Sequence, residues 1–101
     1  MDPGKPDICI SDVVVSRAGR DAGKLYYVIS LDGDFLFLVN GKDRTLEKPK
    51  KKKRKHASVV LRSQTRVAEK LRCGDKVLNS ELRRDLAYLS RELQSNTLGG
   101  K

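Results

Sequence analysis

Aromatic and metal-binding side chains are scarce in this sequence. It has no tryptophan, three tyrosines, two phenylalanines and a single histidine, His56. A zinc site that needs two histidines is therefore excluded. The two cysteines, Cys9 and Cys73, have no second ligand at metal-binding spacing, and we expect both to be small, buried or half-buried side chains. The sequence leaves a disulfide between them open, although a cytoplasmic protein would keep them reduced.

Long apolar segments are also missing. The N-terminal residues 1–6 are polar and interrupted by prolines, unlike a signal peptide, and no run approaches the length of a membrane-spanning helix. We therefore expect a cytoplasmic protein without a membrane partner. A chain of 101 residues is about one domain. Its 38% hydrophobic content suits a modest core, so a small barrel would need packed helices to support it.

Positive charge is abundant. The net charge is +9, and seven of the eight residues from 48 to 55 are lysine or arginine. This balance favours nucleic acid or an anionic membrane surface as a partner. Because like charges repel and Pro49 cannot donate to a β-ladder, we expect the basic loop at residues 42–56, between two strands, to be flexible and ordered only towards its end. Two other interpretations stay open: the run only keeps the protein soluble, or residues 49–55 form a nuclear-import signal.

The first part of the chain has the pattern of β-strands. Predicted strands cover residues 8–16, 24–31, 35–39 and 57–62, where β-branched and aromatic residues gather. Asp32-Gly33-Asp34 and Asn40-Gly41 supply turns. The strand at 35–39 is apolar on both faces, so its outer face is expected to be covered as well.

The C-terminal part is helical in pattern. A helix is predicted over residues 65–72, ended by Gly74, and a second begins at Asn79 as N-cap with Glu81 in its first turn. Leu82, Leu86, Leu89 and Leu93 form an apolar stripe. The stripe either covers the strand at 35–39 or binds another protein. The predicted organisation is a flexible lead-in (1–7), a β-domain (8–62), a helical extension (63–95) and a flexible tail (96–101).

Catalytic patterns are absent from the sequence. The loop at residues 19–24 differs from a P-loop, because three rather than four residues separate its glycines and Leu25 stands where a Mg²⁺-binding hydroxyl is needed. The carboxylates of Asp32 and Asp34 are explained by a turn. The serines have no histidine–acid partners in reach of a catalytic triad. We therefore expect neither an enzyme nor a cofactor.

Four segments follow one another in a recognisable order: Ser16–Lys24, an apolar strand, Phe35–Gly41 and a basic stretch up to His56. This order resembles the KOW motif. The resemblance covers residues 13–61, about half the chain. Among the large-subunit ribosomal proteins of archaea and eukaryotes, the chain most resembles the "fourteen-e" and "twenty-seven-e" types. It also resembles short bacterial KOW-domain proteins labelled RNA-binding. Residues 77–83 are similar to a helix start in that bacterial group.

The resemblance implies a five-stranded SH3-like barrel that docks on structured RNA. The expected fold is thus mostly β with C-terminal α: an SH3-like KOW barrel packed against one or two helices. Gly19 and Gly23 would be the motif glycines, and Arg17, Arg20 and Lys24 the loop contacts to RNA. Because the helices exceed the minimal barrel, both a ribosomal protein and an accessory factor of assembly or translation remain open.

The predicted function is RNA binding through phosphates, in a monomer associated with ribosomal RNA or another structured RNA and with ribosomal subunit proteins. Phosphate neutralisation releases counterions and makes such binding salt-dependent. A protein-interaction adaptor, using the barrel or the leucine stripe, is the alternative, and weak attachment to an anionic membrane is a third. The predicted RNA contacts are Arg17, Arg20, Lys24, Lys42, Arg44, Lys48, Lys50, Lys51, Lys52, Lys53, Arg54, Lys55 and His56.

Overall fold

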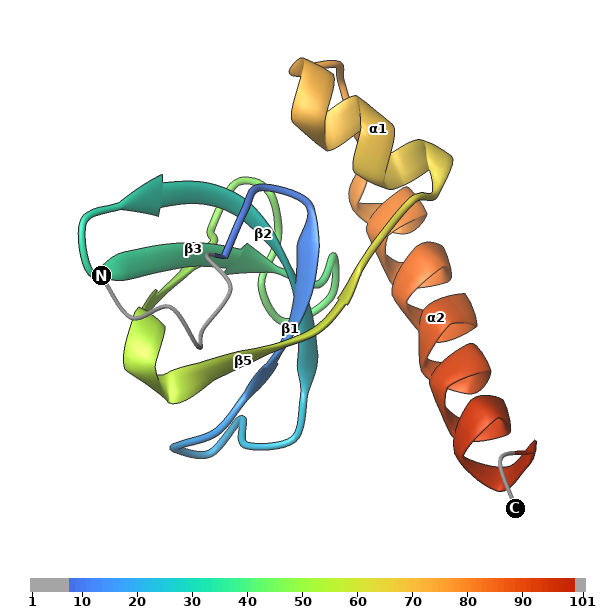
Figure 1. Cartoon of the computed structure of the whole chain (residues 1–101). Coiled ribbons are helices and arrows are strands. Elements are labelled where there is room, and N and C mark those ends of the chain that lie inside the picture. Colours follow the sequence, from blue (N-terminus) through green and yellow to red (C-terminus); the bar gives the residue numbers. More distant parts are fainter. Residues whose placement is uncertain (1–7, 100–101) are drawn as a thin grey trace.

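A curved antiparallel sheet of five strands and two α-helices make up the protein (Figure 1). The computed structural model describes the backbone of residues 8–99 and the side chains of residues 8–94, so the predicted lead-in and residues 100–101 lie outside the described residues. The strands follow the spatial order β4-β3-β2-β1-β5. Their bounds are β1 Asp12–Ser16, β2 Leu25–Asp32, β3 Phe35–Val39, β4 Lys50–Lys53 and β5 Ala57–Arg62.

The expectation of a mostly β domain with two C-terminal helices is confirmed. β1 pairs with both β2 and β5, which brings the first and last strands together. The strands β4 and β5 are the two edges and do not pair with each other, so within residues 8–99 the sheet is not closed.

The prediction of a flexible loop over 42–56 is wrong for its second half. Lys50–Lys53 form β4, antiparallel to β3 with Phe35 opposite Lys53 and Leu38 opposite Lys50, and Arg54–His56 form the 3₁₀ helix η1. Tertiary pairing with β3 thus overrides the low strand propensity of lysine. The residue pattern predicted four strands, and this segment supplies the fifth.

The start of β1 and the two cysteines also differ from expectation. β1 begins at Asp12 rather than at residue 8, because a turn precedes it: the Asp12 N–H donates to the Cys9 carbonyl at 3.1 Å, and Ser11 has a φ of +76°. Both cysteines are exposed and are not joined in a disulfide, which corrects the expectation that they are buried. Cys9 lies in that turn, and Cys73 is the last residue of a helix.

The helix α1 covers Arg66–Cys73, one residue later at each end than the predicted 65–72, and it ends at Gly74 as its sequence predicts. At its start, the Thr65 hydroxyl accepts a hydrogen bond from the Ala68 N–H at 3.2 Å. At its end, Gly74 has the left-handed conformation (φ +79°) that favours glycine.

The long helix α2, Asn79–Gly99, begins differently from the prediction and ends later. The Leu78 carbonyl accepts the first helical bond, from the Leu82 N–H at 3.2 Å, so Leu78 rather than Asn79 is the N-cap. Glu81 accepts from the Leu78 N–H at 2.9 Å. The Asn79 side chain instead binds the loop before β4, accepting from the Leu46 N–H at 2.8 Å. Residues 96–99, predicted as tail, belong to the helix.

Each face of the sheet packs against its own hydrophobic cluster. Neighbouring strand residues point to opposite faces, so Val13 and Tyr27 belong to one cluster and Val14 and Tyr26 to the other. The inner cluster lies within the curve of the sheet and consists of Ile8, Val14, Tyr26, Val28, Leu36 and Leu38. The outer cluster lies beneath the helices and consists of Val13, Tyr27, Val39, Val67, Ala68, Val77, Leu82, Leu86 and Leu89.

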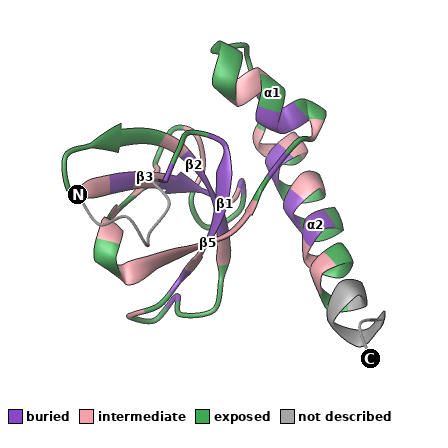
Figure 2. Ribbon diagram, viewed as in Figure 1, coloured by how far each residue is buried: buried purple, intermediate pink, exposed green. Residues whose placement is uncertain are grey.

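Three leucines of the α2 stripe, Leu82, Leu86 and Leu89, are therefore part of the core (Figure 2). Leu82 is fully buried and Leu86 and Leu89 nearly so, which leaves little of the stripe for another protein. The expected covering of β3 is only partial. Val39 lies beneath the helices, whereas Phe35 and Phe37 are half-buried and belong to neither cluster.

A buried polar network fixes α2 to the sheet. The Tyr27 hydroxyl and the Thr65 hydroxyl both donate to the Asp85 carboxylate, the latter at 2.8 Å. Ser63 completes the network at 2.8 Å from the Tyr27 hydroxyl. Burial and the bond to Asp85 raise the pKa of Tyr27 to about 12. The helix is thus held in place by oriented polar contacts as well as by leucine packing.

Candidate nucleic-acid interface

The loop between β1 and β2, residues 17–24, is closed at its base by backbone hydrogen bonds. The Gly23 N–H donates to the Ser16 carbonyl at 2.8 Å, and the Ser16 N–H donates to the Lys24 carbonyl at 3.1 Å. Gly19 and Gly23 have φ values of +84° and +91°, a backbone region that other residues rarely adopt. The predicted motif glycines therefore shape this loop.

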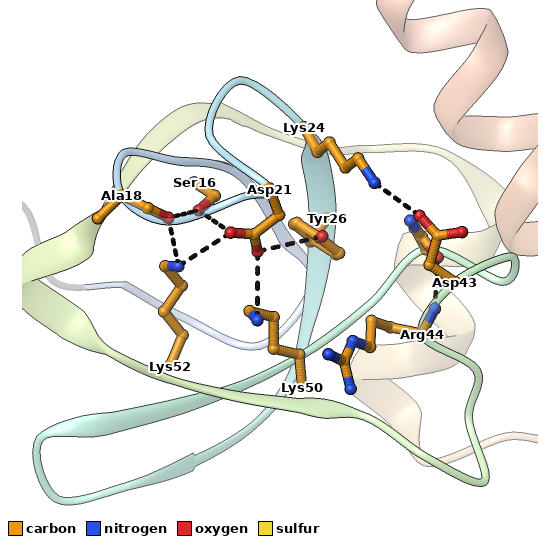
Figure 3. Close-up of polar contacts among 10 residues, drawn as sticks. Ser16, Ala18, Asp21, Lys24, Tyr26, Asp43, Arg44, Lys50 and Lys52 are labelled. Carbon is orange, nitrogen blue, oxygen red and sulfur yellow. Dashed lines mark hydrogen bonds and ion pairs between the residues drawn. The ribbon is translucent and has the colours of Figure 1, made fainter.

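Asp21 is a buried carboxylate at the centre of the loop (Figure 3). It accepts hydrogen bonds from the Ser16 hydroxyl at 3.1 Å and from the Tyr26 hydroxyl at 3.2 Å. The ammonium groups of Lys52 and Lys50 lie 3.3 and 3.5 Å from its oxygens. Burial alone would raise the pKa of Asp21, but the bonds from Lys52 and Ser16 and the charge of Lys50 lower the pKa to about 2.

Through these contacts Asp21 joins β4 to the β1–β2 loop. Lys52 also donates to the Ala18 carbonyl at 2.9 Å, so one lysine binds two points of the loop. The side chain of Lys52 is 9% exposed and that of Lys50 23% exposed. These two predicted RNA contacts turn inward and are neutralised by Asp21. This geometry indicates that Lys50 and Lys52 stabilise the fold.

The other lysines of β4 lie on its outer face. Strand alternation places Lys51 and Lys53 opposite to Lys50 and Lys52, and both are exposed. Lys51 is over the Phe35 ring, with its ammonium 4.4 Å from the ring centroid. The four lysines of this strand thus divide into an inner pair that binds Asp21 and an outer pair that faces solvent.

The 3₁₀ helix η1 lies beside the first residue of the loop. The Arg17 N–H donates to the His56 carbonyl at 2.8 Å, and the Arg17 guanidinium donates from Nε to the Ser58 hydroxyl at 3.0 Å. Arg54 is anchored to the β2–β3 turn, where its N–H donates to the Asp34 carbonyl at 2.7 Å. We call the cations that this packing gathers the basic end; they are Arg17, Arg20, Lys53, Arg54, Lys55 and His56.

The remaining predicted contacts lie in the loop between β3 and β4 or, like Lys24, face that loop. Lys24 forms an ion pair with Asp43 at 2.8 Å, which lowers the pKa of Asp43. The N–H groups of Lys42 and Arg44 both donate to the Asn40 side chain, at 2.9 and 3.0 Å. These residues and Lys48 are exposed. Lys24 therefore faces the β3–β4 loop rather than the basic end.

Sequence reasoning missed Asp21, Phe35 and Phe37. Asp21 resembled an ordinary turn residue, although a single carboxylate inside a basic loop already suggested a partner for nearby lysines. The sequence predicts a covered outer face for the strand that carries Phe35 and Phe37. Strand alternation predicts that both share a face with Val39. It does not predict how far along that face the helices extend.

No protein-family model matches the sequence, and no curated protein is significantly similar to it. Between residues 8 and 99, no helix is long and apolar enough to cross a membrane. Over the same residues, no three or more histidine, cysteine or acidic side chains gather as they would around a metal ion.

Proposed function

We propose that this protein binds structured RNA through the phosphates of its backbone. The observation that carries the proposal is β4 itself: a strand of four lysines held in place by Asp21, with its outer lysines exposed next to the basic end. The two inner charges are neutralised within the protein. The outer charges are held in a fixed array, so they lose less conformational entropy on binding than a flexible run would.

The cations of the basic end support the same partner. Within the described part of the chain, no acidic side chain forms an ion pair with Arg17, Arg20, Lys53, Arg54 or Lys55. These charges are therefore available to neutralise phosphates and release counterions. A dense single-sign surface is also self-repelling, which an anionic partner relieves.

The finer proposal is an SH3-like KOW domain associated with the ribosome, as a ribosomal protein or an accessory factor. Its support is the KOW-like order of motifs together with a curved five-stranded sheet in which β1 pairs with β5. On this proposal the partners are ribosomal RNA and neighbouring subunit proteins, the chain acts as a cytoplasmic monomer, and it catalyses no reaction.

Charge reversal tests the RNA proposal. We expect Lys53→Glu combined with Lys55→Glu to weaken binding of a labelled RNA hairpin at least about tenfold, measured by fluorescence anisotropy. The matched control is Arg66→Glu combined with Lys76→Glu. It changes the net charge equally near α1, at the opposite end of the molecule from the β1–β2 loop (Figure 1). An equal loss in both variants would show only a net-charge effect and would refute this interface.

Sedimentation tests the ribosomal part separately. The tagged protein in cell lysate should travel with a ribosomal subunit on a sucrose gradient and return to the top after RNase treatment. RNA binding in the anisotropy assay without co-migration would reject the ribosomal partner but keep the RNA function. Co-migration that resists RNase would instead favour a protein-interaction adaptor.

A further inference from the structure

The outer face of β3 and β4 carries two phenylalanines beside two lysines. Strand register places Phe37 opposite Lys51 and Phe35 opposite Lys53. Directly opposite residues of an antiparallel pair share a face, so these four side chains project from the same side of the sheet. On the other flank of β3, Phe37 is opposite Ser30 and Phe35 is opposite Asp32. The Phe37 end is thus bordered by a neutral and a cationic residue.

This face is left uncovered by the helices. Val39 shares the face and is fully buried beneath α1 and α2, yet Phe37 and Phe35, further along the strand, are half-buried and outside both clusters. They are the only phenylalanines of the chain. Leaving part of an aromatic ring in water forgoes burial energy of roughly 25 cal/mol per Å² of apolar surface. A partner that covers the rings would recover it.

The surrounding charge selects the kind of partner. Lys51 already contacts the Phe35 ring with its ammonium at 4.4 Å, which shows that a cation and a π-face meet here. Lys53 is exposed and belongs both to this outer row and to the basic end. An aromatic ring flanked by exposed ammonium groups complements a nucleotide, because the base can stack on the ring while its phosphates bind the lysines.

We propose that the outer face of β3–β4 holds an unpaired nucleotide of the bound RNA, with its base stacked on Phe37 and its phosphates bound by Lys51 and Lys53. This inference rests on the proposed RNA function and extends it: the basic end binds the paired backbone, and Phe37 recognises a bulged or loop base next to it. The RNA class is therefore a helix interrupted by an unpaired base.

Two RNAs of equal length test the inference. One is a fully paired duplex, and the other has a single unpaired 2-aminopurine, whose fluorescence is quenched by stacking. The wild-type protein should quench the probe and bind the bulged RNA roughly 5- to 100-fold more tightly than the duplex. Phe37→Leu, which keeps an apolar side chain, should lose that preference and the quenching but retain duplex binding. Tyr88→Leu removes an exposed aromatic ring of α2 and should change neither.

Each other outcome has a definite meaning. Quenching and preference that persist in Phe37→Leu overturn the stacking site while RNA binding stands. Equal loss for both RNAs also overturns it. Failure of the wild-type protein to bind either RNA rejects the proposed function itself. If Phe37→Leu does not fold, crosslinking of the wild-type protein tests the site. An RNA with 5-iodouracil at the unpaired position should crosslink within residues 35–39. Crosslinking elsewhere rejects the site.

Discussion

At the scale of single residues, Asp21 has the largest role in shaping the interface. It is one buried carboxylate surrounded by Ser16, Tyr26 and two lysines, and it holds both the β1–β2 loop and β4. Removing one partner of a buried ion pair leaves the others without compensation for their lost hydration. Its contribution should therefore be visible in the stability of the fold.

Asp21→Asn should lower the free energy of unfolding at pH 7 by about 2 kcal/mol, since the pKa of Asp21 falls from 3.8 to about 2 on folding. The folded carboxylate has the lower pKa, so its contribution is complete above about pH 5 and disappears as the pH falls through about 2. Urea unfolding of both proteins between pH 5 and pH 2 measures this. Within that pH range, the difference in free energy of unfolding between the wild type and Asp21→Asn should disappear. A difference that does not change with pH would contradict the ion-pair account.

The glycines differ in what their positions require. A Cβ on Gly41 would overlap the Asn79 carbonyl oxygen and lie 3.0 Å from the Leu82 Cβ, whereas a Cβ on Gly23 meets nothing within 4 Å. Both have positive φ, at +77° and +91°. Gly41→Ala should therefore destabilise the protein by about 2–5 kcal/mol, from backbone strain and overpacking.

Gly23→Ala is the matched comparison, with a cost of about 1–2 kcal/mol from backbone strain alone. Thermal unfolding of the two variants measures both. Equal destabilisation would show that the approach of α2 to Gly41 is not as close as the structure has it. The motif glycine that the sequence singled out is thus the more tolerant of the two.

At the scale of elements, β4 shows where sequence reasoning succeeded and where it did not. The strands at 35–39 and 57–62 followed from β-branched and aromatic runs, and the cap at Gly74 followed from backbone chemistry. β4 could not be predicted, because like charges and low propensity oppose a strand of lysines. It forms because β3 offers an open edge and Asp21 neutralises two of the charges, and both causes lie far away in sequence.

Asn79 illustrates the same limit at the start of α2. Its residue type and position suit an N-cap, but the loop before β4 passes close by, and its side chain binds Leu46 instead. Local rules predict which residues can cap a helix. Which bond is made depends on what the fold places next to them.

The alternation along β4 predicts a separation of stability from binding. Lys50→Gln with Lys52→Gln should lower the free energy of unfolding by about 1–3 kcal/mol, because Asp21 loses its cationic partners. Lys51→Gln with Lys53→Gln removes the same charge and should change stability by less than about 0.5 kcal/mol while weakening RNA binding. Urea unfolding and anisotropy on both double variants measure this. Identical behaviour of the two pairs would show that the lysines act as an undivided charged run.

At the scale of the whole molecule, the sheet separates two cores and leaves one region of its surface for a partner. The inner cluster fills the curve of the sheet, and α1 and α2 cover the outer face as far as Val39. The leucine stripe predicted helical cover of the strand at 35–39 as one of two alternatives, the other being the binding of another protein. It did not show that helical cover ends before Phe37, since that depends on the angle at which α2 crosses the strands.

The basic surface lies beyond that covered region. Residues predicted as one set of RNA contacts are divided by the fold into the inner pair on Asp21, the outer row of β4, the basic end and the β3–β4 loop. In the β3–β4 loop, Lys42, Arg44 and Lys48 are exposed and have no acidic ion-pair partner among the described residues. The outer row and the basic end also have no such partner, and they are held in place by β4 and η1. The central claim is that these groups bind phosphates.

The salt dependence of RNA binding tests this claim most directly. With roughly six phosphate contacts, a plot of log affinity against log salt should have a slope of about −5, and Lys51→Gln with Lys53→Gln should reduce its magnitude by about 1–2. Anisotropy titrations of a hairpin RNA from low to physiological salt measure both slopes. A steep wild-type slope that these substitutions reduce is the predicted result. A flat wild-type response, or a slope that the substitutions leave unchanged, would contradict the account.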